Sequence, residues 1–313
     1  APFLFIIVID YISKRSAQDF GYLTHIGATD TSDRSVRSTT RQSNQRINDL
    51  TFADDIALLE NDNNRAQCQI EALKNEASNV GLEISDTKTV QLRLNETEDQ
   101  TQPPNLQIDG KTIEIVDEFK YLGSYVVNIN KDINNRIALT WNAFNKLKSI
   151  LTSRTGKPSV KMKIRLFNAA CISILLYGCE TWTLNEKLSN KLDVFARTCY
   201  RIMLGIRQSE VHMTNKELYK ITEQIPISTL VRQRQLQFIG HCLRMPNNEP
   251  ANIYALYSSS HQSNVPSHGY LNQISANLTS DKKTKLTAKE ISKYAMIKSN
   301  WNKSIAALNK PDR

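Results

Sequence analysis

The pattern of apolar residues changes once along the chain, near residue 130, and this change limits the folds open to it. Before that point, short apolar runs alternate with polar stretches, as in residues 106–113, where Asp109-Gly110 suits a two-residue hairpin turn. After it, apolar residues recur every three or four positions, first in a stripe from Ile133 to Leu151. This order predicts an α+β fold, in which a mixed strand and helix region precedes an all-helical region.

The charge of the chain changes at the same place. Residues 1–130 carry 12 Lys and Arg against 20 Asp and Glu, whereas residues 131–250 carry 19 against 8. Residues 251–313 carry 9 against 3. We therefore expect three regions, 1–130, 131–250 and 251–313, the last a loose linker with a C-terminal helix. A basic helical surface can contact a polyanion or can be an ordinary solvated face, and charge alone leaves both open.

Local patterns place the remaining elements. Helical spacing predicts helices over residues 63–80, after Pro158, and over residues 188–206, 226–245 and 286–308. Gly81 is expected to end the helix over residues 63–80. Thr214 to Glu217 has the spacing of a capping box, which predicts the start of a further short helix. Residues 82–94 and 119–127 are predicted to be strands, and the polar residues 246–281 are predicted to be loose.

Hydropathy and cysteine usage exclude two classes of protein. No apolar run approaches the roughly 20 residues that span a bilayer, and the run from Phe3 to Ile9 lacks the flanks of a signal peptide. The five cysteines include no C-x-x-C pair, which predicts reduced, mostly buried thiols and no structural zinc. We expect an intracellular protein, nuclear or cytoplasmic.

Two adjacent aspartates, Asp54 and Asp55, lie between two apolar runs. Aspartate tolerates turns and weakens strand interiors, so residues 49–59 are predicted to form a strand, a tight turn and a second strand. Two carboxylates held at such a tip suit a hard divalent cation such as Mg²⁺. The alternative is an ordinary Asp-containing turn, which the spacing alone favours.

The surrounding sequence resembles a known family. Phe52-Ala53-Asp54-Asp55 resembles motif C of reverse transcriptases. Four further segments follow in order: residues 81–89 are similar to the segment that contains motif D, 118–124 to the motif E primer grip, and 176–182 and 238–245 to two segments of LINE-type enzymes. The chain thus resembles the C-terminal part of a LINE-type (non-LTR) retrotransposon reverse transcriptase: a partial palm followed by a helical thumb and C-terminal region.

The resemblance implies roles for individual residues at the polymerase centre. Asp54 would bind Mg²⁺ or Mn²⁺, with Asp55 as its acidic neighbour. Lys88 would lie near the incoming triphosphate. The alternative for Lys88 is an ordinary solvated lysine at a strand end. Tyr121, Leu122 and Gly123 would lie against the primer end, although Gly123 could simply serve a bulge or turn.

The resemblance also implies the partners: an RNA template, a DNA primer and deoxynucleoside triphosphates. No membrane is expected, and the oligomeric state is left open. Basic side chains off the apolar stripes would contact phosphates without reading sequence; they are Lys146, Lys148, Lys161, Lys163, Arg165, Lys187, Lys191, Arg197 and Arg201. The alternative is that they serve solubility. Tyr177 and Trp182 are expected to pack rather than to stack on bases.

The match lacks one essential part. Reverse transcriptases need a further aspartate from motif A, upstream of motif C. Asp10 looks similar, but residues 1–6 better resemble the helix that follows motif B, so we expect Asp10 on a palm helix. We therefore expect a fragment without motif A and the fingers, inactive by itself. The alternatives are a non-catalytic RNA- or DNA-binding remnant of a retroelement, or a decayed element without a role.

Overall fold

The computed structural model describes residues 2–17, 20–23, 46–94, 104–154, 158–247, 249–256, 270–279 and 285–308. The chain divides into two compact units, Ala1–Phe119 and Lys120–Arg313. The three regions expected from the sequence stay a prediction.

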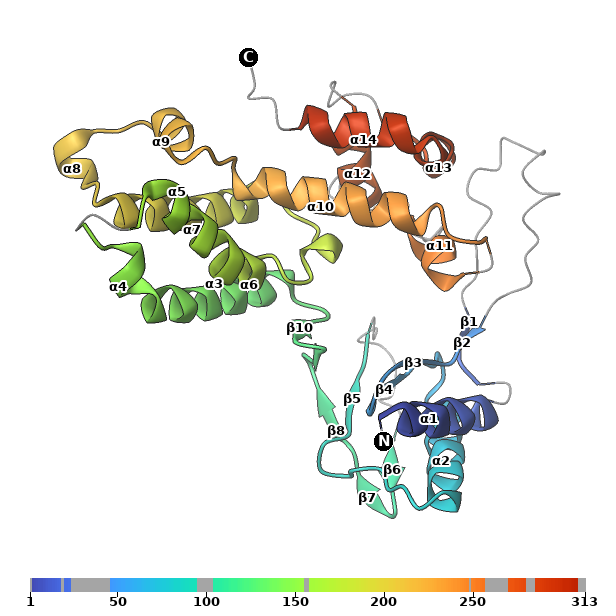
Figure 1. The fold of residues 1–313 in the computed structure, drawn as a ribbon. Helices are drawn as coiled ribbons and strands as arrows, with labels where there is room; N and C mark the ends of the chain where they lie inside the picture. The colour runs from blue at the N-terminus through green and yellow to red at the C-terminus, as the bar shows by residue number, and fades with distance from the viewer. Residues whose placement is uncertain are drawn as a thin grey trace. The chain divides into compact units, whose positions relative to one another are not determined.

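The first unit combines helices with two-stranded sheets (Figure 1). Its elements are α1 (Pro2–Ser16), β1 (Tyr22–Leu23), β2 (Arg46–Ile47), β3 (Asp49–Phe52), β4 (Asp55–Leu58), α2 (Asn63–Asn79), β5 (Val90–Leu92), β6 (Gln107–Ile108), β7 (Lys111–Thr112) and β8 (Glu114–Val116). The pairs β1–β2, β3–β4 and β6–β7 are antiparallel, whereas β5 and β8 pair in parallel.

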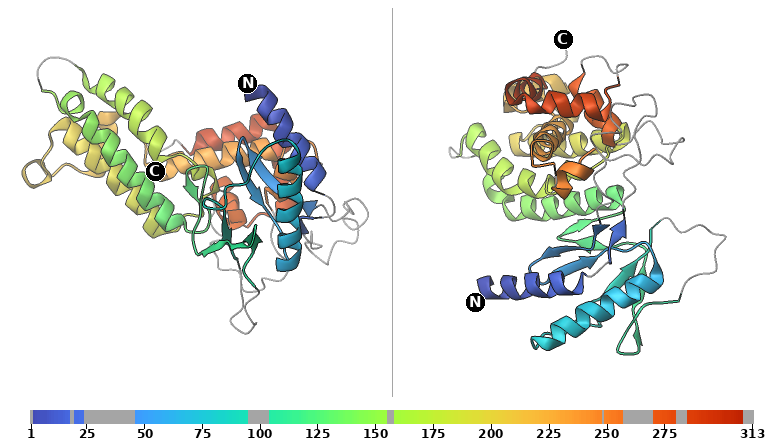
Figure 2. Two further views of the ribbon diagram at one scale, coloured as in Figure 1. Left: turned by 90° about the horizontal axis from the view of Figure 1, so that it is seen from below. Right: turned by 90° about the vertical axis from the view of Figure 1, so that its right-hand side faces the viewer.

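Helices α1 and α2 pack against each other and are the dark blue and cyan helices of Figure 2. Ile12 and Leu73 are buried between them, and Ile56 of β4 packs on the same cluster. Helix α2 begins at Asp62, whose side chain accepts from Arg65 N–H, and ends before Gly81, whose φ of 77° only glycine adopts freely. The strand β4 is therefore fixed to a packed helical layer.

The second unit is a short hairpin followed by helices. Its elements are β9 (Lys120–Tyr121), β10 (Ser124–Tyr125), α3 (Ile129–Lys146), α4 (Lys148–Leu151), α5 (Val160–Phe167), the π-helix η1 (Asn168–Ile172), α6 (Ser173–Leu175), the 3₁₀-helix η2 (Cys179–Thr181), α7 (Glu186–Leu204), α8 (Gln208–Val211), α9 (Asn215–Thr222), α10 (Ile227–Cys242), α11 (Pro250–Tyr254), α12 (Tyr270–Leu278), α13 (Ala288–Met296) and α14 (Lys298–Ala307).

Two apolar cores hold the helices of this unit together, and α10 contributes to both (Figure 1). The larger core contains the buried rings of Phe144 and Phe167, which meet edge to face. The smaller surrounds Trp301, whose Nε1 donates to the carbonyl of Leu236 at 2.8 Å. Gly240 leaves room for this ring, because a Cβ there would lie 2.3 Å from Trp301 Nε1.

Much of the expected secondary structure is confirmed. The α+β class, the Asp109-Gly110 hairpin, the capping box at Thr214 and the placement of Asp10 on a helix all appear in the structure. Four of the five free cysteines are buried; the exception is Cys68. In the described part of the chain, no helix has both the length and the apolar character to cross a membrane.

Other expectations were wrong. The strand predicted over residues 82–94 is reduced to β5, and that predicted over 119–127 turns back on itself as β9 and β10. The predicted loose segment 246–281 contains α11 and α12, because Ile274 of α12 is buried in the smaller core despite its polar neighbours. The helix predicted over 286–308 is two helices, separated at Ile297.

Candidate functional site

The two aspartates lie at the tip of the β3–β4 hairpin. The strands pair from Asp49 opposite Leu58 to Phe52 opposite Asp55, so the turn between them consists of Ala53 and Asp54. Ala53 has a φ of 54°, a conformation that two-residue hairpin turns require at their first position and that a non-glycine residue adopts at a cost. The turn therefore holds Asp54 at the tip and Asp55 as the first residue of β4.

Both carboxylates face solvent, whereas the base of the hairpin is fixed. Asp54 and Asp55 are exposed, and among the described residues neither carboxylate forms a hydrogen bond or an ion pair. At the base, Gln69 of α2 donates through Nε2 to the carbonyl of Asn48 at 2.9 Å. The result is a rigid support that presents two neighbouring negative charges without counter-ions of their own.

This arrangement fits part of a magnesium site. Mg²⁺ takes oxygen ligands and is commonly held by one or two carboxylates with water and substrate phosphates, which two exposed aspartates allow. Within the described ranges, no group of three or more His, Cys, Asp or Glu side chains is placed to hold a metal. Asp10 supplies no third carboxylate here, since it lies on α1 and pairs with Lys14 at 2.7 Å.

Lys88 lies on an exposed turn of the same unit. The turn is closed by Lys88 N–H, which donates to the carbonyl of Ser85 at 3.3 Å, and by the hydroxyl of Thr89, which donates to the same oxygen at 2.7 Å. No ion pair joins Lys88 to Asp54 or Asp55 in the described structure. The neighbouring Asp86 pairs with Lys111, whose hydrogen bond and charge lower the pKa of that carboxyl.

The segment predicted to contact a primer forms a tight loop in the second unit. Tyr121 pairs with Ser124, which leaves Leu122 and Gly123 as a two-residue turn with φ values of 48° and 85°. We call residues Tyr121 to Ser124 the 121–124 loop. Two positive φ angles in succession are typical of a type I′ turn, in which leucine is strained.

Helix α3 and the segment after α6 hold this loop. Arg136 donates through Nη2 to the hydroxyl of Ser124 at 3.0 Å and also to the carbonyl of Gly123, and Tyr177 donates to the carbonyl of Leu122 at 2.9 Å. Arg136 lies over the ring of Tyr177, 4.4 Å from its centre. Arg136 could not be recognised from the sequence, because a basic residue on an amphipathic helix looks like part of its solvated face.

The chain is similar in sequence to known proteins. Residues 1–126 match the family model described as reverse transcriptase (RNA-dependent DNA polymerase). The chain is also 32% identical over 214 residues to a transposon-derived protein of Caenorhabditis elegans; the match covers 65% of this chain and 74% of that protein. The chain belongs to the reverse transcriptase family. No solved structure matches it.

In this reverse transcriptase chain, most of the basic residues predicted to contact nucleic acid are accessible. Six of the nine are exposed and two are half-buried; the exposed ones are Lys146, Lys148, Lys161, Arg165, Lys187 and Lys191, and the half-buried ones are Arg197 and Arg201. The expectation that Lys163 lies off the apolar face was wrong. Its side chain is buried and its Nζ donates to the carbonyl of Ser153, so its role in the fold is to join α5 to the end of α4.

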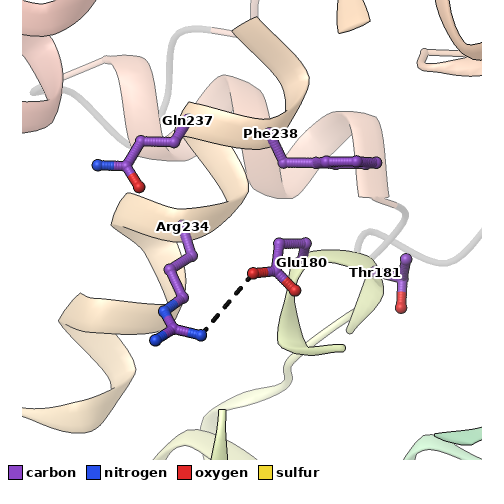
Figure 3. Close-up of a pocket in the computed structure, with 5 residues that line it drawn as sticks. All are labelled: Glu180, Thr181, Arg234, Gln237 and Phe238. Carbon is purple, nitrogen blue, oxygen red and sulfur yellow. Dashed lines mark ion pairs between the residues drawn. The ribbon is translucent and has the colours of Figure 1, made fainter. Parts of the chain in front are cut away.

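A shallow hollow lies between η2 and α10 (Figure 3). Across it, Arg234 approaches Glu180 at 3.9 Å and donates to the carbonyl of Leu176 at 3.1 Å. The ring of Phe238 forms part of its wall and is 42% exposed. Because Arg234 already bonds to two groups of the segment opposite, the contacts across the hollow attach that segment to α10.

Proposed function

We propose that this chain supplies the catalytic hairpin, primer grip and thumb of a LINE-type (non-LTR) retrotransposon reverse transcriptase. Such an enzyme extends a DNA primer on an RNA template with deoxynucleoside triphosphates. The five segments that resemble this group follow its order from Phe52 to Met245. The transposon-derived relative supports the same origin.

The observation that carries the proposal is the exposed acidic pair at a two-residue hairpin turn. When bound, Mg²⁺ or Mn²⁺ would neutralise charge on the attacking and leaving oxygens of nucleotidyl transfer. Asp54 and Asp55 would hold the metal, and Lys88 would attract the triphosphate of the incoming nucleotide. Tyr121, Leu122 and Gly123 would lie against the 3′ end of the primer.

Two carboxylates are fewer than this chemistry needs, since a third comes from motif A and the sequence contains no such segment. We therefore expect the 313-residue chain to make no DNA by itself. The product of the longest reading frame that contains this sequence is expected to extend a DNA primer on an RNA template in Mg²⁺, and to stop when the metal is chelated. Incorporation of labelled nucleotide on a denaturing gel measures both.

Comparable synthesis by the 313-residue chain would contradict the expected inactivity. Absence of synthesis by the longer product, at any divalent metal concentration, would contradict the polymerase proposal. The second candidate would then remain: a non-catalytic RNA- or DNA-binding remnant. It is favoured by a specific observation, the exposed basic residues on helices α3 to α7.

Both candidates require that these helices bind nucleic acid. The double substitution Lys161→Gln/Arg165→Gln is expected to weaken binding of an RNA–DNA hybrid and to reduce the slope of log K against log salt by about 1 to 2, because up to two phosphate contacts are lost. Fluorescence anisotropy over a series of salt concentrations measures the slope. Lys14→Gln/Arg15→Gln removes the same charge from exposed positions of α1 and serves as the control. Equal slopes for the two double variants would show that α5 makes no phosphate contact.

A further inference from the structure

We propose that Tyr177, Asp132 and Trp182 are positioning residues that hold the 121–124 loop in the conformation that meets the primer end. The inference rests on the proposed function, because the loop has a primer to meet only in a polymerase. It gives a function to the 176–182 segment, which has no part in the proposed binding of the metal, the nucleotide or the primer.

The loop needs external support because its backbone is strained. Leu122 has a φ of 48°, and such a conformation in a bulky residue persists only where surrounding contacts over-determine it. The two strands beside it are two residues each, so their own pairing supplies little support. The contacts that fix the loop must therefore come from elsewhere in the unit.

The 176–182 segment provides the first of these contacts. Tyr177 donates its hydroxyl to the carbonyl of Leu122, the strained residue itself. The next residue, Gly178, has a φ of 72°, and a Cβ on it would lie 2.7 Å from the hydroxyl oxygen of Ser124. Only glycine therefore allows this segment to approach the loop so closely.

Asp132 provides the second contact, from inside the protein. Its carboxylate is 1% exposed and accepts from Tyr125 N–H at 3.1 Å and from Trp182 Nε1 at 2.9 Å. One carboxylate thus joins the strand that leaves the loop to the tryptophan of the 176–182 segment. Buried carboxylates are costly unless their oxygens are satisfied, so this group favours one arrangement of loop and segment.

The far side of the segment is attached to α10 and α12. Gln235 donates through Nε2 to the carbonyl of Trp182 at 2.7 Å, and Tyr270 donates its hydroxyl to the carbonyl of Glu180 at 2.7 Å. Arg234 adds the ion pair with Glu180 that Figure 3 draws, and a hydrogen bond to the carbonyl of Leu176. The segment is therefore a fixed support between the helical core and the loop.

Two matched variants test the proposal on the 313-residue chain. Tyr177→Phe and Tyr270→Phe each remove one tyrosine hydroxyl that donates to a backbone carbonyl, but only the first bond reaches the loop. Tyr177→Phe is expected to raise the rate of amide hydrogen exchange in residues 120–126 about five- to tenfold. This is the change expected when one neutral hydrogen bond is lost. Tyr270→Phe is expected to leave exchange there unchanged.

The second readout is preference for a primer end. The unsubstituted chain is expected to bind an RNA–DNA hybrid with a recessed 3′ end more tightly than the same hybrid with blunt ends. Tyr177→Phe should reduce that ratio several-fold without weakening binding to the blunt hybrid, and Tyr270→Phe should keep it. Equal exchange in the two variants overturns the proposal, and so do equal ratios when the unsubstituted chain prefers the recessed end. A missing preference in the unsubstituted chain counts against the proposed function, whereas the exchange measurement tests the support of the loop independently.

Discussion

Asp54→Ala is expected to lower DNA synthesis by the product of the longest reading frame by about 10³-fold or more, because the metal ion that stabilises the reacting phosphate would lose a ligand. The hairpin itself should fold as before, because the Asp54 carboxylate is exposed and has no hydrogen bond or ion pair with the described residues. Single-turnover incorporation of one nucleotide, with the metal in excess, measures the chemical step. The binding of the RNA–DNA hybrid should change little.

Asp109 offers a matched control for this substitution. It is also an exposed aspartate at a two-residue hairpin turn of the first unit, but its carboxylate pairs with Lys74. Asp109→Ala should therefore leave incorporation within about twofold, since an exposed ion pair contributes little. If Asp54→Ala reduced synthesis no more than Asp109→Ala does, the acidic pair of β3–β4 would not be the catalytic centre.

The hairpin that carries this prediction could be derived from the sequence. Two acidic residues interrupt a run of strand-forming residues, and a two-residue turn is the shortest connection that pairs the flanks. The positive φ of Ala53 could not be derived, because nothing in an alanine favours it. Its conformation is imposed by the pairing of Phe52 with Asp55.

Short strands, and short helices within polar segments, were harder to predict than the β3–β4 hairpin. Of the residues 82–94, three form a strand, because only they find a partner, in β8. Helix α12 was missed because the segment around it, residues 246–281, is mostly polar, although the helix itself has one buried face. In both cases, tertiary contacts decide the local structure, and a single sequence shows the propensity without the partner.

The support of the 121–124 loop shows the same limit for a functional site. Asp132 and Arg136 lie four residues apart on α3, a spacing that in most helices marks an exposed ion pair. Here both are buried, because the loop and Trp182 cover them. The motif at residues 176–182 could be recognised in the sequence, but its contact with the 121–124 loop could not.

Burial makes Asp132 the site of the largest expected loss of stability. Asp132→Ala is expected to lower the free energy of unfolding by about 3–5 kcal/mol, because the guanidinium of Arg136 would stay buried without its carboxylate, 3.8 Å away. Trp182 Nε1 and Tyr125 N–H would also lose their acceptor. Urea denaturation followed by tryptophan fluorescence measures the change.

A double substitution separates the buried charge from the lost hydrogen bonds. Asp132→Ala/Arg136→Met removes both ions and should recover part of the stability that Asp132→Ala loses, since no unpaired guanidinium remains. Asp193→Ala is the control: its carboxylate accepts two bonds from Ser228 but forms no ion pair with a buried cation in the described part of the chain, so about 1–2 kcal/mol is expected. A loss for Asp132→Ala no greater than that for Asp193→Ala would mean that α3 tolerates an unpaired Arg136, and the carboxylate would then be dispensable to the loop.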